Sequence, residues 1–340
     1  MASDGPIYIL GLGSIGSFIA QCLRSVADPP PVTLLIHRES LFQDLSANDW
    51  KLGLRVGEHG DLQQSSGFSA ELLGKTASST NQIRHLIVAV KASATVAALE
   101  PYKDRIGRET TICLFQNGLG QIDDLNERLF SDPSVRPTYM CGVIRHGVYL
   151  KAAVEAILSG PNGCVDIGFV DGDKARRGRF LVDTLVRSPM LRCTELKDAD
   201  LLRVQLLKLA TNCVLNPLTA LLDIRNGELS ENSALWPVQR QLLDEISKVF
   251  ENIPGTQEMI CDEAPQFSVA LLETTLRDTV EKTAQNSSSM REDVRKGRST
   301  EIDNINGWII KKGKELGIDC PVNTCLTQMI LAKNRSNMIS

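Results

Sequence analysis

The 340-residue chain is long enough for two domains with a large apolar core. Its hydrophobic content of 42% and formal net charge of −4 are ordinary for a globular protein. It has no run of five or six Lys and Arg that could neutralise the phosphates of a nucleic acid. These limits argue against a nucleic-acid partner and favour a small molecule.

Cysteine usage and the first residues bear on the compartment. The nine cysteines are odd in number and scattered, and no CxxC pair suggests a redox motif or a zinc site. They are typical of reduced core residues, so we expect no metal site. The opening MASDGP has no basic or apolar leader, and no stretch approaches eighteen consecutive apolar residues. We therefore expect an intracellular, cytoplasmic protein with no membrane partner.

A glycine-rich turn follows the first expected strand. Residues 7–10 form a short apolar run, GLGSIG follows, and SFIAQCLRSV then has helical spacing. In such a strand-turn-helix unit the first glycine permits a tight turn and the second lets backbone amides approach a pyrophosphate. The third allows the helix to pack closely on the strand. The turn therefore predicts a dinucleotide site, formed by Gly11, Leu12, Gly13, Ser14, Ile15 and Gly16.

The second expected strand, residues 32–36, ends in a basic pair. Proteins that prefer NAD usually have Asp or Glu there to bind the ribose hydroxyls, whereas this chain has His37 and Arg38. Arg38 therefore predicts a 2′-phosphate, and hence NADP(H). A solvated surface arginine is the alternative, and the neighbouring Glu39 weakens the prediction.

Two further buried strands end in polar residues. The strand expected over 85–90 is followed by Lys91, and the strand over 110–115 is followed by QNGLG. Because open α/β sheets bind ligands at the carboxyl ends of their strands, Lys91 and Asn117 are expected at the ligand edge. For Asn117, an ordinary turn asparagine before glycine is an equal alternative.

The pattern changes along the rest of the chain. Residues 58–82 are polar and rich in Gly and Ser, which predicts loops with at most a short hairpin. Short β-rich pieces between 137 and 170 are expected to extend the first sheet. We therefore predict a Rossmann-type α/β domain over 1–198 and an all-helical domain over 199–340. The helices expected after the first sheet are 174–187, 237–252, 268–285, 292–298, 301–316 and 324–334.

An apolar helix predicted over 201–215 carries a lysine. Nearly every position is Leu, Val, Ala or Cys, so the helix should be buried on most sides. Asn212 and Asn216 follow Lys208 at i+4 and i+8, which puts the three polar groups on one side. Pro217 should end or kink the helix at Asn216. The alternative for Lys208 is a lysine that reaches water at a domain boundary.

A second polar stretch lies near residue 300. Ser289 and Glu292 have the spacing of a capping box, and a serine-capped helix start also suits a carboxylate ligand. Glu301 shares a helix side with apolar residues four and seven positions further on, so it should border the buried face. It could hold a substrate hydroxyl, whereas an ion pair with Arg298 is an equal alternative.

Together these residues resemble the ketopantoate reductase (2-dehydropantoate 2-reductase) family over nearly the full length. The resemblance rests on GLGSIG, QNGLG, KLATNCVLNPLTAL, RNGEL, SSM, GRSTEIDNINGWI and CPVN. It implies a nucleotide-binding domain, then an all-helical domain, and an active site between them. The implied reaction is the reduction of 2-dehydropantoate to (R)-pantoate by NADPH, in pantothenate and coenzyme A biosynthesis.

The resemblance also implies roles at matching positions. Lys208 would be the general acid that orients the carbonyl, and Glu301 the partner of the substrate hydroxyl. Asn117 would lie where nicotinamide and substrate meet. The implied substrate contacts are Asn117, Asn212, Asn226 and Ser289. The implied cofactor contacts are Gly11, Gly13, Gly16, Arg38 and Lys91.

Two departures from the family pattern bear on the substrate, and one of them is a middle region that runs long. Ile144 and Arg145 stand where many members have Thr or Ser, which leaves the keto acid open. The alternatives are an NADPH-dependent reductase of another 2-keto acid and a non-catalytic NADP-binding regulatory protein. The expected partner is a small 2-keto acid. The sequence leaves open whether the chain is a monomer or a homodimer.

Overall fold

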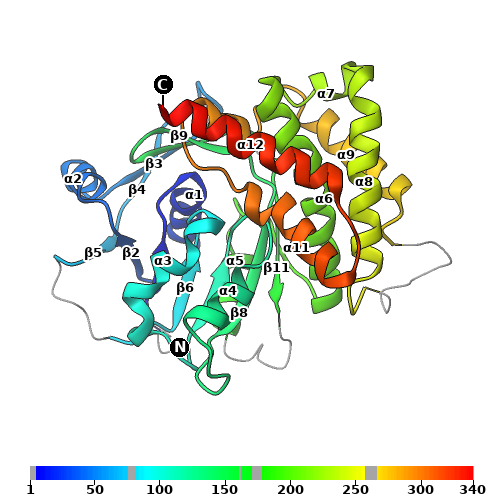
Figure 1. The fold of residues 1–340 in the computed structure, drawn as a ribbon. Coiled ribbons are helices and arrows are strands. Elements are labelled where there is room, and N and C mark those ends of the chain that lie inside the picture. The colour runs from blue at the N-terminus through cyan, green and yellow to red at the C-terminus, as the bar shows by residue number, and fades with distance from the viewer. Residues whose placement is uncertain (1–4, 76–80, 161, 171–177, 257–265, 340) are drawn as a thin grey trace. The chain divides into compact units, whose positions relative to one another are not determined.

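The structure is a computed structural model that describes residues 5–75, 81–160, 162–170, 178–256 and 266–339 (Figure 1). The chain divides into two compact units. The first unit consists of Met1–Gln116 and Gln121–Leu201, and the second of Asn117–Gly120 and Leu202–Ser340. A four-residue segment from the middle of the first unit's sequence thus belongs to the second unit.

An eight-stranded sheet forms the centre of the first unit, in the order β12-β11-β8-β7-β6-β1-β2-β5. The strands from β5 to β8 in this order are parallel, and β11 runs antiparallel to β8. The strand order reverses at β1, so the ligand edge of this doubly wound sheet lies at the carboxyl ends of β1 and its neighbours. The predicted Rossmann-type sheet is therefore confirmed. Its strands are β1 (Ile7–Leu10), β2 (Val32–Ile36), β5 (Phe68–Leu72), β6 (His85–Val88), β7 (Thr111–Leu114), β8 (Thr138–Ile144), β11 (Val165–Phe169) and β12 (Cys193–Glu195).

Both faces of this sheet are covered, which is why its central strands are continuous apolar runs. Ile7 and Ile9 belong to the core on one face, with residues of α1 (Ser14–Arg24) and α5 (Arg179–Val186). Tyr8 and Leu10 belong to the core on the other face, with residues of α3 (Thr95–Leu99) and α4 (Gln121–Arg128). The alternation follows the two-residue period of a strand. Other helices of this unit are α2 (Glu39–Ala47), η1 (Ala92–Ala94) and η2 (Glu100–Arg105).

A second sheet has four strands in the order β4-β3-β10-β9. It packs on α1, with Leu52, Leu54 and Ala156 in the shared core. The prediction that residues 137–170 all extend the first sheet is therefore wrong for β9 and β10. The parallel pairing of β10 with β3 joins segments far apart in sequence, and local patterns do not reveal it. The strands are β3 (Leu52–Val56), β4 (Gln63–Ser65), β9 (Val148–Ala152) and β10 (Glu155–Leu158).

The loops predicted over 58–82 include strands. β4 forms a short hairpin with β3, whereas β5 pairs in parallel with β2 at the edge of the main sheet. In β5 only Phe68 and Leu72 are buried, and Ser69 is exposed. A short edge strand with so few buried side chains has the composition of a loop, which explains the wrong prediction.

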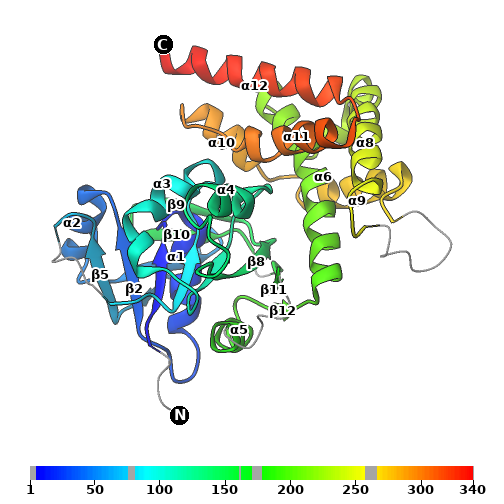
Figure 2. The same cartoon turned by 60° about the horizontal axis from the view of Figure 1, so that its bottom comes forward.

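The second unit contains helices and no strand among its described residues. Figure 2 shows α11 beside α12 and α8 beside α9, in agreement with their contacts. One hydrophobic core, which includes Leu209, Val214, Ile246 and Ile309, joins them. The predicted helical C-terminal region is confirmed. Its helices are α6 (Asp198–Leu222), α7 (Glu228–Glu231), η4 (Ser233–Leu235), α8 (Trp236–Glu251), α9 (Val269–Lys282), α10 (Ser289–Arg295), η6 (Ile302–Asn304), α11 (Asn306–Leu316) and α12 (Pro321–Ile339).

Two alternatives were predicted for the Lys208 helix at Asn216, an end and a kink. The end is wrong, because α6 continues through Pro217 to Leu222. Pro217 has no N–H to donate to the carbonyl of Cys213, four residues before it. Nδ2 of Asn306 donates to that carbonyl at 2.8 Å. A side chain from elsewhere in the unit thus replaces the lost helical hydrogen bond, and Asn216 is buried within the helix.

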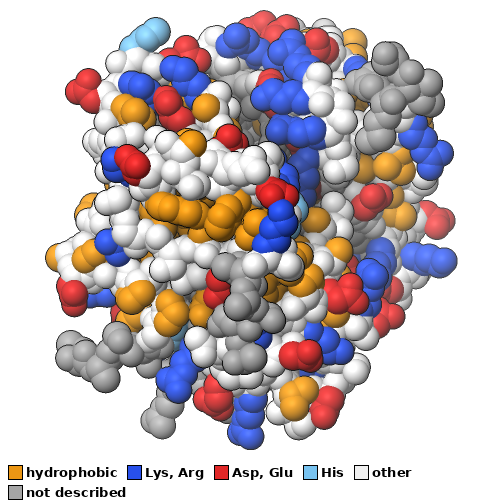
Figure 3. Space-filling view, turned by 90° about the vertical axis from the view of Figure 1, so that its left-hand side faces the viewer, with side chains coloured by type: hydrophobic (Ala, Val, Ile, Leu, Met, Phe, Trp, Pro, Cys, Tyr) orange, Lys and Arg blue, Asp and Glu red, His pale blue; other side chains and the backbone are white. Residues whose placement is uncertain are grey.

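Charges of both signs lie on the face drawn in Figure 3, with hydrophobic side chains between them. Val56, Leu62 and Leu73 are the large apolar side chains that β3, β4 and β5 or their flanking residues leave exposed. None of the helices in the described part of the chain combines the length and apolar character needed to cross a membrane.

Candidate active site

The loop after β1 has the geometry of a dinucleotide-binding turn. Gly11 has a φ of 100°, and a Cβ there would lie 2.6 Å from the backbone N of Val90. A Cβ on Gly16 would lie 1.8 Å from the carbonyl oxygen of Gly11, so both positions require glycine. A Cβ on Gly13 would have no atom within 4 Å, and Gly13 precedes α1 without a capping side chain. This open position at a helix N-terminus fits a pyrophosphate. The other residues of the turn are the buried Leu12 and the half-buried Ser14 and Ile15.

Arg38 lies just past the carboxyl end of β2 and is exposed. Its neighbour Glu39 forms an ion pair with Lys75. Desolvation lowers the pKa of His37, and the charge of Arg38 lowers it further, so His37 is mostly neutral at pH 7. Of the basic pair His37 and Arg38, the guanidinium of Arg38 is therefore the cation at pH 7.

The loop that carries Lys91 is fixed by Gln116, which the sequence analysis did not single out. Nε2 of Gln116 lies 2.8 Å from the carbonyl oxygen of Val90 and 2.7 Å from Oγ1 of Thr95. These contacts hold the residues on both sides of the half-buried Lys91. A polar residue at the end of a buried strand was the available signal for Gln116.

Asn117 and Glu301 contact each other within the second unit. Nδ2 of Asn117 donates to Oε2 of Glu301 at 3.1 Å, although the residues are 184 positions apart. Both side chains are half-buried. Asn117 is thus more than a turn residue, because its amide meets a carboxylate.

The segment 117–120 is seated on the residues just after Glu301. The backbone N of Leu119 donates to the carbonyl of Asn304 at 2.9 Å. Gly118 has a φ of 78°, and a Cβ there would lie 2.3 Å from the same carbonyl oxygen. Glycine after Asn117 is therefore required by this close approach, which positions the asparagine.

Lys208 and Asn212 lie one turn apart on α6, and both are half-buried. The prediction that this helix is buried on most sides holds for residues 213–220, whereas residues 202–205 are only partly buried. Leu209 shares the hydrophobic core with Ile302, the residue after Glu301. The helix that carries Lys208 and the segment that carries Glu301 are thus packed in one core.

Glu301 does not lie in the continuous helix predicted over 301–316. It precedes η6, and Ile305, with a ψ of −94°, separates η6 from α11. Arg298, the alternative partner of Glu301, forms an ion pair with Asp293 at 3.0 Å. The carboxylate of Glu301 therefore comes from a non-helical position and meets Asn117.

The cap of α10 is Ser288, not Ser289. Oγ of Ser288 accepts a hydrogen bond from the backbone N of Arg291 at 3.1 Å, whereas Ser289 is the exposed first residue of the helix. Glu292 accepts a hydrogen bond from Oγ of Ser287 at 2.6 Å. The predicted capping box of Ser289 and Glu292 is wrong by one residue, because three consecutive serines offer three equivalent registers. The hydroxyl of Ser289 is left for another role.

Asn226 joins the loop after α6 to the loop after α9. Its Nδ2 donates to Oγ1 of Thr283 at 3.0 Å, and the backbone N of Gly227 donates to the carbonyl of Ala284 at 3.0 Å. A Cβ on Gly227 would lie 2.8 Å from the Cβ of Ala284, which accounts for the Asn-Gly pair. Oδ1 of Asn226 is buried without a hydrogen-bond partner among the described residues.

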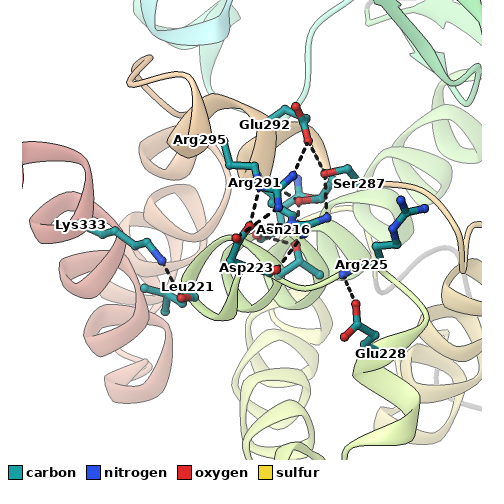
Figure 4. A network of polar contacts seen from close by, with 12 residues as sticks. Asn216, Leu221, Asp223, Arg225, Glu228, Ser287, Arg291, Glu292, Arg295 and Lys333 are labelled. Atoms are coloured by element: carbon teal, nitrogen blue, oxygen red, sulfur yellow. Dashed lines mark hydrogen bonds and ion pairs between the residues drawn. The ribbon is translucent and has the colours of Figure 1, made fainter. Parts of the chain in front are cut away.

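Asp223, just past the end of α6, accepts hydrogen bonds from two arginines of α10 (Figure 4). Nε of Arg295 and Nε of Arg291 lie 2.6 and 2.9 Å from Oδ1 of Asp223. Hydrogen bonds from Arg295 and then from Arg291 lower the pKa of Asp223 from 3.8 to about 2. These bonds tie the end of α6 to the helix that begins at Ser289.

Asp223→Asn should remove an acid-dependent part of the stability. The folded carboxylate binds its proton more weakly than the unfolded one, so the stabilisation is full above about pH 3.8 and is lost as pH falls towards about 2. The side chain is 53% exposed, so screening by water keeps the effect small. Urea unfolding gives the free energy of unfolding at about pH 5 and at about pH 2.5. This free energy should fall less between the two pH values in the variant than in the wild type.

A matched control for this variant is Asp244→Asn. Asp244 forms an exposed i,i+4 pair with Lys248, and a single pair of this kind contributes little. Its loss of stability between the two pH values should match that of the wild type. An equal loss in Asp223→Asn would contradict a role for the two arginines.

Sequence profiles of one family match both parts of the chain. The profile described as "Ketopantoate reductase PanE/ApbA" matches residues 7–172, and "Ketopantoate reductase PanE/ApbA C terminal" matches residues 200–334. A 2-dehydropantoate 2-reductase of Vibrio cholerae is 33% identical, across 97% of this chain and 98% of that protein. The chain belongs to the ketopantoate reductase family. As a member of the ketopantoate reductase family it is an oxidoreductase, so the resemblance and the enzyme class predicted from the sequence are confirmed.

Relatives of this ketopantoate reductase family member also include enzymes with other names. "Ketoisovalerate reductase BEA2" of Gibberella fujikuroi is 25% identical, across 96% of this chain and 83% of that protein. A solved D-mandelate dehydrogenase with NADH and anilino(oxo)acetate has a TM-score of 0.81 at 22% identity, across 98% of this chain and 99% of that one. This last likeness shows the same fold.

Proposed function

We propose that this chain reduces 2-dehydropantoate to (R)-pantoate with NADPH. The observation that carries the proposal is the 3.1 Å hydrogen bond between Asn117 and Glu301. The family resemblance implies that both residues contact the substrate, and they come from segments 184 positions apart. A contact between an amide and a carboxylate forms a site that can both donate to and accept from a hydroxylated keto acid.

Apart from Asn117, the groups proposed to bind NADP(H) belong to the first unit. The open position at Gly13 suits the pyrophosphate, and the exposed guanidinium of Arg38 suits a 2′-phosphate. Lys91, beyond the carboxyl end of β6, adds a second cation at the ligand edge. When bound, the cofactor supplies the hydride.

Lys208 is the proposed general acid of the second unit. Reduction of a ketone develops negative charge on its oxygen, and an ammonium can both stabilise this charge and donate a proton to it. Asn212, one turn further along α6, offers an amide N–H₂ on the same side of the helix. The half-burial of both residues limits the water that would otherwise compete for the oxygen.

Glu301 is proposed to accept a hydrogen bond from the substrate hydroxyl. Asn117 donates to Oε2 of Glu301, which orients the carboxylate and leaves acceptor positions for the hydroxyl. The exposed hydroxyl of Ser289 and the unpartnered Oδ1 of Asn226 are the further proposed substrate contacts. In this proposal the ammonium of Lys208 acts at the substrate carbonyl, and the carboxylate of Glu301 binds the substrate hydroxyl.

Reduction of another 2-keto acid is the second candidate, because two relatives are named ketoisovalerate reductase. The loop that first suggested it weakens the case. Ile144 is buried at the end of β8, and Arg145 forms an ion pair with Asp166 of β11. Both side chains are thus engaged within the first unit.

NADPH oxidation with different keto acids tests the proposed function. Ketoisovalerate lacks the hydroxyl of 2-dehydropantoate, and a lost hydrogen bond to a charged group costs about 1.5–3 kcal/mol, or roughly 10- to 150-fold. We expect kcat/KM for 2-dehydropantoate to exceed that for ketoisovalerate by this factor. Equal values would favour the second candidate. Binding of NADPH without oxidation in the presence of any keto acid would favour a regulatory protein.

Arg38→Ala tests the choice of cofactor. The variant should raise the KM for NADPH by about 10-fold or more and change the KM for NADH little, because only NADPH has the 2′-phosphate. Arg128→Ala is the control. Arg128 is also an exposed arginine, but it is the last residue of α4 and is not among the groups proposed to bind the cofactor. An unchanged preference in Arg38→Ala would assign the 2′-phosphate to another residue.

A further inference from the structure

Pro217 leaves the carbonyl of Cys213 without its helical donor, and Asn306 supplies one. Cys213 directly follows Asn212 and lies five residues after Lys208. Asn306 is the first residue of α11, five residues after Glu301, and its side chain has no exposed surface. One buried hydrogen bond thus connects the helix of the proposed acid to the segment of Glu301.

The direction of the Asn306 amide is set by a chain of buried groups. Oε2 of Glu245, on α8, accepts from Nδ2 of Asn323 at 2.8 Å and from its backbone N at 3.0 Å. A carboxylate at neutral pH only accepts, so Asn323 must present its Oδ1 on the other side. Nδ2 of Asn306 donates to that oxygen at 3.0 Å.

The same chain leaves Asn306 with one orientation. Because Oδ1 of Asn323 accepts a hydrogen bond, the group of Asn306 that faces it must be the amide nitrogen. The second N–H on this nitrogen then points at the carbonyl of Cys213, whose oxygen lies 2.8 Å from Nδ2 of Asn306. Glu245 is 7% exposed and also accepts from the backbone N of Val322, so it is held at the start of α12. α8, α12, α11 and α6 are therefore joined by one set of buried hydrogen bonds.

We infer that Asn306 is a positioning residue for the active site, which sets Lys208 and Asn212 relative to Glu301, and that Glu245 and Asn323 orient it. The inference rests on the proposed function. It acts through α6, because the carbonyl that Asn306 binds belongs to the turn after Lys208. A displacement of about 1 Å in reacting groups can cost about 10²-fold in rate.

Asn306→Ala should lower kcat roughly 10- to 100-fold and leave NADPH affinity nearly unchanged, since the groups proposed to bind the phosphates of the cofactor lie in the other unit. Pro217→Ala restores an N–H that can bond to the carbonyl of Cys213. The double variant Asn306→Ala/Pro217→Ala should therefore recover most of the lost kcat, while Pro217→Ala alone stays near wild type. Such recovery would not follow if Asn306 merely filled space.

Gln239→Ala is the matched control. Nε2 of Gln239 donates to the carbonyl of Leu229 at 3.1 Å, and the residue is 4% exposed. This change removes the same kind of buried hydrogen bond in the same unit, so it should lower the urea concentration at the midpoint of unfolding without lowering kcat. All variants are compared at a temperature where circular dichroism shows them folded.

Hydrogen exchange gives a readout that is independent of activity. Amides over 209–216 should exchange faster in Asn306→Ala than in wild type, and the double variant should restore protection. If wild type reduced no keto acid, the proposed function would fail while exchange still decided the role of Asn306 in holding α6. An active wild type with full kcat in Asn306→Ala, or a loss that Pro217→Ala does not recover, would overturn the inference. Should Asn306→Ala not fold, Asn323→Ala replaces it. Its kcat should fall less than that expected for Asn306→Ala, and adding Pro217→Ala should again recover the lost kcat.

Discussion

Lys208→Ala should lower kcat by about 10²–10⁴-fold while the Kd for NADPH changes little. The ammonium acts at the carbonyl oxygen only as charge develops there, so its loss affects the transition state more than the ground state. Stopped-flow NADPH oxidation with saturating 2-dehydropantoate gives kcat, and fluorescence titration gives the Kd. If electrostatic stabilisation is lost together with the proton, the fall will lie at the upper end of this range.

Two further lysine variants make the test specific. Lys208→Arg should recover little activity, because a guanidinium keeps its proton and has a different shape. Lys333→Met is the control, since Nζ of Lys333 donates to the carbonyl of Leu221 at 2.7 Å and so contacts the same helix, α6. That variant should cost stability and leave kcat unchanged. Wild-type kcat/KM in Lys208→Ala would mean that the lysine is structural.

The features that the sequence predicted well depend on residues close together in the chain. The glycine turn lies between a strand and a helix within residues 7–24. The positive φ of Gly11 and the close approach of Gly16 to the carbonyl of Gly11 are local features, although Gly11 also approaches the distant Val90. Parallel strands buried on both faces are continuous apolar runs, so β1 and β2 were predicted to the residue and β6 and β7 to within two residues at each end. Local chemistry was sufficient for these elements.

The features that were missed depend on distant partners. β10 is a strand of the second sheet because it pairs with β3, about 100 residues earlier. α6 passes Pro217 because Asn306, 93 residues away, donates to the carbonyl of Cys213. From the sequence, Pro217 had only its local effect, which is to break a helix.

The candidate site shows the same division. The sequence predicted that Lys208, Asn117 and Glu301 belong to the active site. It left open whether Asn117 is only a turn residue and whether Glu301 forms an ion pair with Arg298. The contact between Asn117 and Glu301, and the ion pair of Arg298 with Asp293, bear on both alternatives. Neither contact could be predicted from spacing, because each depends on how the loops around η6 and α10 fold.

Glu301→Ala should reduce kcat/KM for 2-dehydropantoate by roughly 10- to 150-fold, because a hydrogen bond from the substrate hydroxyl to a charged group is lost. Glu301→Gln keeps an oxygen for Asn117 and a neutral acceptor for the hydroxyl, so its loss should be smaller. Asp303→Ala is the control, because Asp303 is an exposed acid two residues away. It should behave as wild type.

Pairing this variant with two substrates isolates the hydroxyl. If Glu301 binds the hydroxyl, Glu301→Ala should lower kcat/KM for 2-dehydropantoate and leave that for ketoisovalerate, which has no hydroxyl, nearly unchanged. The preference between the two substrates should then collapse in the variant. An equal loss on both substrates would instead assign Glu301 to the carbonyl chemistry of Lys208. A loss of NADPH binding by a folded variant would assign it to the cofactor.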